Sequence, residues 1–403
     1  MARRGASLAL GLVVMAGLVN YVDRVTLSVA GPTIAAELHL SPSQMGLLLS
    51  AFLWAYALAQ APAGTLIDRV GPRPLLAGAM LLWSAAQAAT GFAASLPQLI
   101  AARLALGLGE APQFPVGARV VRGWFAAKDR GLATGVFNSV STLGPALAPP
   151  IVVALILAVG WRGAFIATGL AGVVVALIWL AFYRDPAAPS VEEAAAAPTP
   201  WSALLAQPTL WAMALGNAGS GYMNWFYAAW LPGYLQSARH LTLPQTGWAA
   251  SVPYLFGFAG SLAGGWFCDR LAARGLSPIA SRKVPIVAGL AIGAAFTGLT
   301  IAAPTSLAAV AAIAVALFCA NAAGASIWAL AVVAAPRGAV ARVGAVQNVG
   351  GLLGGALAPI VTGISVEATH SFVAALATTA VAALGGAAVY LAAVRRPLLL
   401  YER

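Results

Sequence analysis

The chain has 403 residues, of which 61% are hydrophobic and only 8% are charged, and its mean hydropathy is +0.87. A water-soluble protein of this length needs many more surface charges, so the composition excludes a soluble protein and predicts an all-α membrane protein. The net charge of +11 does not indicate nucleic-acid binding, because seventeen of the 22 lysines and arginines fall on one side of the predicted spans, with Arg162 and Arg239 on the other. By the positive-inside rule, both termini should be cytoplasmic and the number of spans even.

Six spans are predicted in the first half, at about residues 8–36, 44–67, 75–94, 97–121, 131–157 and 162–183. The first apolar run is followed by eleven more, which predicts a retained helix rather than a signal peptide. The longest polar break, at 183–200, is rich in Ala, Pro and Glu and is typical of a flexible linker. The predicted organisation is therefore an N-terminal six-helix bundle at 1–183, a cytoplasmic linker at 184–207 and a C-terminal six-helix bundle at 208–403.

The first span contains two adjacent charges, Asp23 and Arg24, in an otherwise apolar helix. A charge at a helix centre costs at least about 2.5 to 3.5 kcal/mol on insertion scales, so such a residue usually faces a cavity or a partner. Neighbours on a helix point about 100° apart, so these two side chains cannot pair well with each other. We therefore expect each to find a partner on another span.

The fourth span supplies candidate partners. Arg103 and Glu110 lie seven residues apart, two turns along one face, and the glycines of the intervening "LALGLG" allow other helices to approach closely. Pro112 and Pro115 should kink the helix beside Glu110. The alternative interpretation is a charge-paired latch between the two spans that has no part in transport.

Motifs of the first half recur in the second. "LSPSQMG" at 40–46 aligns with "LTLPQTG" at 241–247, and at the same offset of 201 residues Asp68-Arg69 aligns with Asp269-Arg270. "NSVSTLGPALAP" at 138–149 matches "NVGGLLGGALAP" at 348–359 at an offset of 210. These matches indicate duplicated halves of the same orientation, an architecture in which substrate binds near the membrane midplane between two bundles.

Several of these stretches carry a family resemblance. "GTLIDRVGPR" at 64–73 resembles the loop signature between helices 2 and 3 of the major facilitator superfamily, and "GWFCDR" at 265–270 its weaker second copy. "NYVDRVTLSVAGPTIAAEL", "SAFLWAYALAQAPAG", "RLALGLGEAPQFP" followed by "GWF", and "WLPGYL" together resemble the anion:cation symporter family. That family includes bacterial galactonate, glucarate and hexuronate permeases and vesicular glutamate and sialic acid carriers. The resemblance implies twelve transmembrane helices and an inner-membrane carrier that takes up an organic anion with a cation, usually a proton.

The resemblance also implies residue roles. Arg24 would bind the substrate carboxylate, Asp23 and Glu110 would be protonation sites, and Arg103 would pair with an ionised carboxylate. A second group, in the cytoplasmic loops, would make state-dependent contacts between the halves; it consists of Asp68, Arg69, Gly71, Arg73, Asp269 and Arg270. For this loop group, topology charges plus a turn are the alternative interpretation.

Neutral polar and aromatic residues complete the predicted substrate site. The first half offers Tyr21, Trp54, Tyr56, Gln60, Asn138 and Ser141, and the second half offers Asn224, Trp225, Tyr227, Tyr254, Gln347 and Asn348. The second half has no ionisable acid or base in the core of its spans apart from tyrosine and cysteine. Charge on one side and hydroxyl or amide groups on the other suit a small hydroxylated acid, although each such residue alone is more typical of an interhelical contact.

We therefore predict a transporter that takes up a small organic anion with a proton, with a sugar acid as the first choice. An aromatic or short hydroxy monocarboxylate is the alternative substrate, and a drug/proton antiporter, suggested by "LGPALAPP" at 143–150, is a second alternative. A sensor without flux would need a large soluble extension, which we do not expect at either terminus. No metal-ligand spacing, phosphate-binding loop or activated nucleophile occurs, so we predict no enzyme activity and no cofactor besides the coupling ion. The expected partners are the substrate and the lipid bilayer, and the expected functional unit is a monomer.

Overall fold

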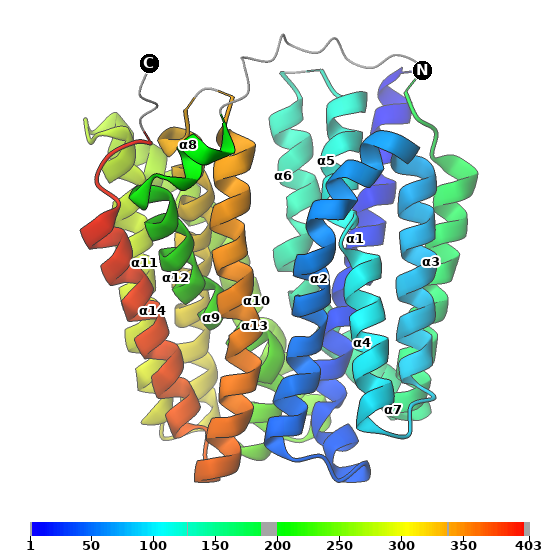
Figure 1. Cartoon of the computed structure of the whole chain (residues 1–403). Coiled ribbons are helices and arrows are strands. Elements are labelled where there is room, and N and C mark those ends of the chain that lie inside the picture. Colours follow the sequence, from blue (N-terminus) through cyan, green and yellow to red (C-terminus); the bar gives the residue numbers. More distant parts are fainter. Residues whose placement is uncertain (1, 127, 187–199, 337, 399–403) are drawn as a thin grey trace. The chain divides into compact units, whose positions relative to one another are not determined.

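The computed structural model describes residues 2–126, 128–186, 200–336 and 338–398, and its ordered elements are helices (Figure 1). The chain divides into two compact units, Met1–Glu192 with Pro232–Ser251, and Glu193–Leu231 with Val252–Arg403. The central part of the predicted linker, residues 187–199, lies outside the described residues. The predicted boundaries between bundles and linker remain a prediction.

The helices of the first half are α1 (Ala2–Glu37), α2 (Pro42–Val70), α3 (Pro72–Thr90), α4 (Leu96–Glu110), α5 (Gln113–Trp124), α6 (Arg130–Asn138) and α7 (Val140–Phe182). The predicted fourth span corresponds to α4 and α5 together. The fifth and sixth predicted spans are joined in α7, which turns at Gly160, where φ is 72°. Glycine fits this turn because a positive φ costs it little.

The helices of the second half are α8 (Trp201–Leu205), α9 (Pro208–Ser237), α10 (Leu243–Ala273), α11 (Pro278–Ile301), α12 (Ser306–Ala334), α13 (Val340–Thr369) and α14 (Val373–Ala393). Within the described ranges, seven helical segments are long and apolar enough to cross a membrane, and one of them, Arg130–Phe182, contains two predicted spans. The chain is therefore a helical membrane protein.

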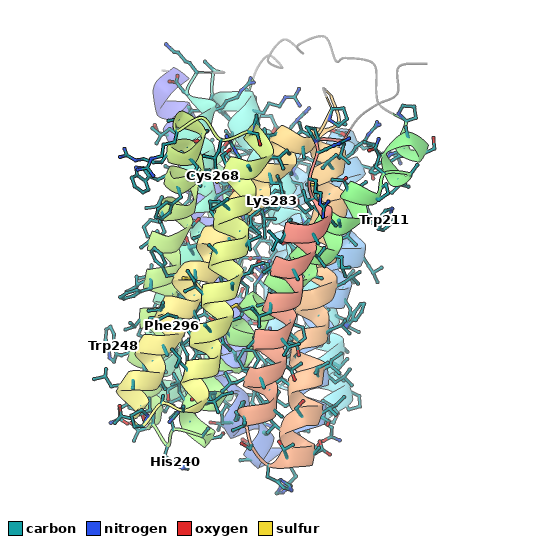
Figure 2. All side chains as sticks on the ribbon, turned by 90° about the vertical axis from the view of Figure 1, so that its left-hand side faces the viewer. Trp211, His240, Trp248, Cys268, Lys283 and Phe296 are labelled. Atoms are coloured by element: carbon teal, nitrogen blue, oxygen red, sulfur yellow. The ribbon has the colours of Figure 1, made fainter. Side chains whose placement is uncertain are left out.

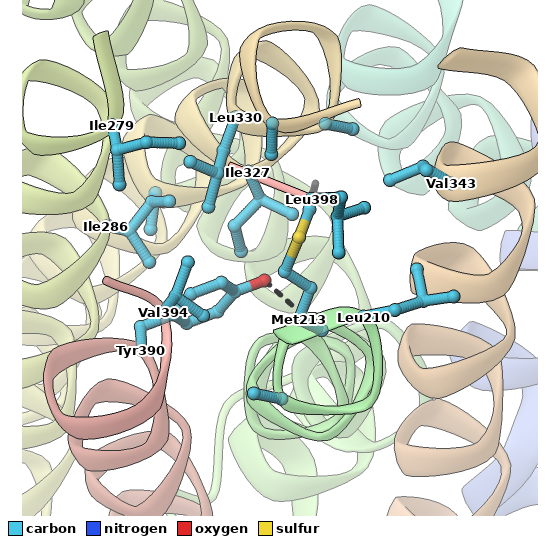
Figure 3. Packing of buried hydrophobic residues seen from close by; sticks show 14 of the residues in the cluster. Leu210, Met213, Ile279, Ile286, Ile327, Leu330, Val343, Tyr390, Val394 and Leu398 are labelled. Atoms are coloured by element: carbon cyan, nitrogen blue, oxygen red, sulfur yellow. Dashed lines mark hydrogen bonds between the residues drawn. The ribbon is translucent and has the colours of Figure 1, made fainter. Parts of the chain in front are cut away.

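The core of the second unit is formed by apolar side chains from α9, α11, α12, α13 and α14 (Figure 3). Tyr390 of α14 donates its hydroxyl proton to the carbonyl oxygen of Met213 on α9 at 3.1 Å, so the one polar atom of this large buried side chain is satisfied.

Figure 2 shows Cys268 and Lys283 toward one end of this unit and Phe296 toward the other. The two cysteines, Cys268 and Cys319, are free and buried, as packing residues should be.

A group of polar contacts that we call the clamp, formed by Glu37, Trp161 and Arg162, lies at one end of the first unit. Glu37, the last residue of α1, accepts a hydrogen bond from Trp161 Nε1 at 2.6 Å and pairs with Arg162. Arg162 also donates to the carbonyl oxygen of Ala93, in the connection between α3 and α4, at 3.2 Å. The clamp therefore joins three chain segments, although its exposed ion pair contributes only about 0 to 1 kcal/mol.

The duplication is visible in two matching helix starts. Ser41 and Gln44 form a capping box at the start of α2, in which the Gln44 side chain accepts from the Ser41 N–H at 2.9 Å. Gln245 makes the same bond to the Thr242 N–H at 2.9 Å, at the start of α10. A histidine in the left-handed conformation precedes each start, His39 with φ 51° and His240 with φ 54°. The local geometry thus follows the repeated sequence.

Replacing His39 or His240 by glycine should stabilise the protein. The left-handed conformation costs about 1 to 2 kcal/mol for a residue with a Cβ atom, and the greater unfolded-state freedom of glycine offsets about half of that. We expect each variant to unfold at a higher temperature in detergent than wild type. Ala101→Gly, at an exposed position inside α4, is the matched control and should unfold at a lower temperature. Unchanged or lower unfolding temperatures for both histidine variants would contradict the prediction.

Candidate functional site

The charged residues of α1 and α4 meet inside the first unit. Arg24 donates from Nε to Glu110 Oε2 at 2.6 Å, and the two side chains are 9% and 0% exposed. Asp23, Arg103 and Glu110 are the buried charged residues among those that the structure describes. The charged residues predicted in the first and fourth spans therefore lie together inside the first unit.

The pairing itself differs from the role expected for Arg103. Glu110 pairs with Arg24, whereas Arg103 donates to the backbone oxygen of Asp23 at 3.5 Å and lies over the Phe165 ring at 5.5 Å. The guanidinium of Arg103 is 2% exposed and therefore desolvated beside Asp23. In this structure, Arg103 contacts the peptide of the first candidate proton site rather than the carboxylate of the second.

The helix containing Glu110 breaks directly after it. α4 ends at Glu110, Ala111 and Pro112 form a turn, and α5 begins at Gln113. Proline has no N–H to donate to the preceding turn and its ring clashes there, which interrupts the helix. The structure thus interrupts the helix directly after Glu110, at the position where the kink was predicted.

Two glycines hold α4 close to its neighbours. A Cβ atom on Gly107 would lie 2.4 Å from the carbonyl oxygen of Phe52 on α2, and one on Gly109 would lie 2.8 Å from the backbone nitrogen of Trp83 on α3. Neither position has room for a side chain. The close approach predicted from "LALGLG" is confirmed, and it fixes the height of Glu110 relative to both helices.

Three aromatic rings surround the Arg24 guanidinium. Its central carbon lies 5.0 Å from the ring centroid of Tyr21, 4.7 Å from that of Phe52 and 4.9 Å from that of Tyr56. Phe52 and Tyr56 are one turn apart on α2 and stack with their centroids 5.5 Å apart. Cation–π attraction of this kind orients the guanidinium while leaving its N–H edge for a ligand. We call these three rings the aromatic box.

Sequence reasoning missed Phe52, although its spacing of four residues from Tyr56 could have identified it as a same-face neighbour. Trp54 lies about 200° around α2 from both rings and is 37% exposed, so the structure does not bring it into the aromatic box. Gln60 follows Tyr56 by one turn on the same face of α2. Ser141 donates to the carbonyl oxygen of Asn138 at 2.7 Å, at the junction of α6 and α7.

Three of the polar residues predicted to bind substrate in the second unit form hydrogen bonds with neighbouring helices of the same unit. Tyr227 shares a hydrogen bond with Thr297 at 2.9 Å and is 1% exposed, while Gln347 donates to the carbonyl oxygen of Ile327 at 3.1 Å. Asn224 accepts from Asn321 at 3.5 Å. The remaining candidates are half-buried, and they are Trp225, Tyr254 and Asn348. Tyr227 and Gln347 therefore act as interhelical contacts here.

A separate groove of about 610 Å³ lies between α3 and α4 of the first unit. Its lining is apolar except for Gln98. A desolvated anion needs a cation or several N–H donors, so this groove is not a site for one.

Comparison with known proteins identifies the fold family. The profile of the Major Facilitator Superfamily matches residues 13–359, with a second match at 215–398. The chain belongs to the Major Facilitator Superfamily. The probable L-galactonate transporter of Escherichia coli (strain K12) is 42% identical over 98% of this chain and 91% of its own length. The probable galactarate/D-glucarate transporter of the same strain is 35% identical, over 93% of this chain and 91% of its own length.

Among solved structures, a bacterial homologue of the human lysosomal transporter Spinster, in an inward-facing and occupied conformation, superposes with a TM-score of 0.78. It covers 96% of this chain and 94% of its own, at 19% sequence identity, and therefore shows the fold. The expected family and fold class are confirmed. This superfamily member is a multi-pass inner-membrane transporter, and its relatives confirm that it is not an enzyme.

The superfamily's loop signature lies between α2 and α3. Gly71 has φ 80° and separates the two helices, while Arg73 donates to the Leu180 carbonyl oxygen at 2.6 Å and accepts from Trp179 Nε1 at 2.9 Å. Arg73 thus anchors α3 to the end of α7 inside the first unit. The other loop residues are exposed, and they are Asp68, Arg69, Asp269 and Arg270. Their state-dependent role remains a prediction.

Proposed function

We propose that this transporter takes up a monovalent sugar acid, of the hexonate or hexuronate type, together with a proton. The observation that carries the proposal is the buried Arg24–Glu110 ion pair inside the aromatic box. The names of the similar E. coli transporters support the substrate class. Tyrosine, tryptophan and asparagine side chains of the second half remain the candidates from the sequence for recognising the substrate hydroxyls.

Charge counting in a low-dielectric interior motivates the proton. Asp23, Arg24, Arg103 and Glu110 sum to zero when all are ionised, so a bound monovalent anion leaves one negative charge. An uncompensated buried charge costs several kcal/mol, and a carboxylate relieves this cost by taking up a proton. One proton on either carboxylate, Asp23 or Glu110, meets this charge balance; a proton on Glu110 would in addition remove the charge that holds Arg24 Nε. One proton per anion would make the cycle electroneutral.

Both termini would lie in the cytoplasm. At the end of the first unit opposite the clamp, Arg73 and Arg184 both donate to the Leu180 carbonyl oxygen, and Arg130 donates to the Arg122 carbonyl oxygen. The clamp end carries Arg162, which Glu37 neutralises. This asymmetry supports a cytoplasmic location for the basic end. Asp23, Arg24, Arg103 and Glu110 all come from one unit of one chain, which supports function as a monomer, with no cofactor besides the coupling ion.

The alternative substrates are an aromatic or a short hydroxy monocarboxylate, and the alternative mechanism is drug/proton antiport. Stacking of an aromatic acid would draw on Trp54, Trp225 and Tyr227, but Trp54 lies away from Arg24 and Tyr227 is buried within its own unit. Competition assays distinguish these alternatives from the proposal: inhibition of uptake by benzoate but not by L-galactonate would favour the aromatic acid.

Substrate affinity should rise as pH falls. If binding takes up one proton, the dissociation constant for L-galactonate should change by up to about tenfold per pH unit over the range in which the carboxylate titrates. The measurement is calorimetric binding on purified protein across pH, with proton uptake followed in a weak buffer on addition of L-galactonate. A pH-independent affinity without proton uptake, accompanied by a sodium requirement, would overturn proton coupling.

A further inference from the structure

Asp23 faces different helices from its neighbour Arg24. Gln87 of α3 donates from Nε2 to the backbone oxygen of Asp23 at 3.4 Å and to Thr168 Oγ1 of α7 at 3.0 Å. Thr168 in turn donates to the carbonyl oxygen of Phe165 at 3.2 Å. Asp23 and Gln87 are 0% exposed and Thr168 is 4% exposed. These bonds link α1, α3 and α7.

This group of side chains has unused hydrogen-bonding capacity. In the part of the chain that the structure describes, both carboxylate oxygens of Asp23 and Oε1 of Gln87 are buried without a hydrogen-bond partner. Thr168 lies beside Asp23, because Gln87 Nε2 donates both to the Asp23 backbone oxygen and to Thr168 Oγ1. A buried unpaired polar group costs about 1 to 3 kcal/mol, so each such group calls for an explanation, and use in another state is the one we develop here.

The two protonation states of Asp23 have opposite needs. The ionised carboxylate needs a donor, which the Thr168 hydroxyl supplies by rotating its proton away from the Phe165 carbonyl. The protonated carboxyl needs an acceptor, which Oε1 of Gln87 supplies. The Gln87 amide is fixed in the required orientation, because its Nε2 must be the atom that faces the Asp23 backbone oxygen.

We propose that Gln87 and Thr168 are positioning residues for the coupling proton on Asp23, the hydroxyl stabilising the ionised form and the amide oxygen the protonated form. This inference rests on the proposed function. The proton is transferred from a hydronium ion: one O–H bond of hydronium breaks, one O–H bond forms on Asp23, and a water molecule is left. When the proton leaves, the Thr168 hydroxyl turns back to the carboxylate.

Other charged and neutral side chains near Asp23 also influence the pH at which its carboxyl group titrates. α4 brings Arg103 and Glu110 toward it, α3 and α7 bring the neutral Gln87 and Thr168, and Arg24 on α1 itself faces the aromatic box. The two α4 charges oppose each other in sign. Removing one neutral hydrogen-bond partner leaves both charges in place, so a change in the titration midpoint of Asp23 reports the loss of that hydrogen bond.

The test follows protonation of Asp23 directly. The infrared C=O stretch of its carboxylic acid, identified by its loss in Asp23→Asn, is titrated against pH in purified wild type and variants. Thr168→Val should move the midpoint to higher pH and Gln87→Met to lower pH, each by about one unit, equivalent to a tenfold change in proton affinity. Thr168→Ser, which keeps the hydroxyl, should titrate as wild type.

Thr90→Val is the matched control, because Thr90 on α3 is 1% exposed and bonds only the Ala86 carbonyl oxygen of its own helix among the described residues. It should leave the midpoint unchanged. Thr168→Ala replaces Thr168→Val if the latter does not fold. Wild-type midpoints in both test variants, or shifts in the same direction, would overturn the inference. Failure of the proposed function is distinguishable, since wild type would then not bind L-galactonate while the infrared midpoints still shifted.

Discussion

Replacing Arg24 by alanine should reduce L-galactonate affinity at least about 100-fold while the protein still inserts into the membrane. A charge-assisted hydrogen bond in a desolvated site contributes about 1.5 to 3 kcal/mol, and the guanidinium supplies two donor edges as well as the compensating charge. Arg24→Lys should recover only part of the affinity, because an ammonium group lacks the planar fork that the aromatic box orients.

The substitution also leaves Glu110 buried without its partner, which typically costs about 3 to 5 kcal/mol of stability. The double variant Arg24→Ala/Glu110→Gln removes both charges and separates the two effects: it should regain thermal stability but not substrate binding. Arg162→Ala, which breaks the exposed ion pair of the clamp, is the control and should bind normally. Affinity near that of wild type in Arg24→Ala would show that the anion binds elsewhere.

Replacing Glu110 by glutamine should uncouple transport from the proton gradient. A permanently neutral side chain imitates the protonated acid, so Arg24 is free at every pH and the carrier can exchange substrate without taking up a proton there. In proteoliposomes we expect counterflow of labelled L-galactonate to persist, while accumulation driven by an imposed pH gradient falls at least about tenfold.

Asp23→Asn is the companion variant, and at least one of the two should show this separation of exchange from accumulation. Glu37→Gln is the matched control, because it removes a carboxylate from the exposed end of the same helix. It should accumulate substrate as wild type does. Gradient-driven accumulation at wild-type levels in both Asp23→Asn and Glu110→Gln would exclude these carboxylates as coupling sites.

The sequence allowed us to predict where the helices lie and which of their positions hold a helix-breaking proline, a glycine at a close contact or a buried charge. These features depend on the residue type and its immediate neighbours in the chain. Proline at 112 ends α4, glycines at 107 and 109 admit neighbouring backbones, and the charges of Asp23 and Glu110 stand out against apolar surroundings. The repeated capping residues likewise give the same helix starts in both halves.

The partners of those charges were not predictable in the same way. The sequence showed that Arg24 needs a partner, but not that the partner is Glu110, because the relative height of α1 and α4 follows from packing between helices. Gln87 and Thr168 were missed for the same reason, since a lone neutral residue in an apolar span gives no signal until its neighbours are known. Trp54 is the opposite case. A tryptophan in a span is a reasonable candidate for substrate binding, but its position on α2 places it on a different face from Phe52 and Tyr56.

The backbone contacts at Gly107 and Gly109 restrict how the site can rearrange. α4 cannot slide along α2 or α3 without bringing backbone atoms into overlap, so the heights of Glu110 and Arg103 are fixed relative to both helices. Arg24 can then exchange Glu110 for a substrate by side-chain rotation, without a shift of α4 along α2 or α3. Side-chain rotation takes picoseconds to nanoseconds where packing permits it, whereas collective helix motions take microseconds to milliseconds. Arg24 would thus exchange Glu110 for the substrate long before the carrier changes from one access state to the other. The turnover rate should therefore not depend on the rate of this exchange.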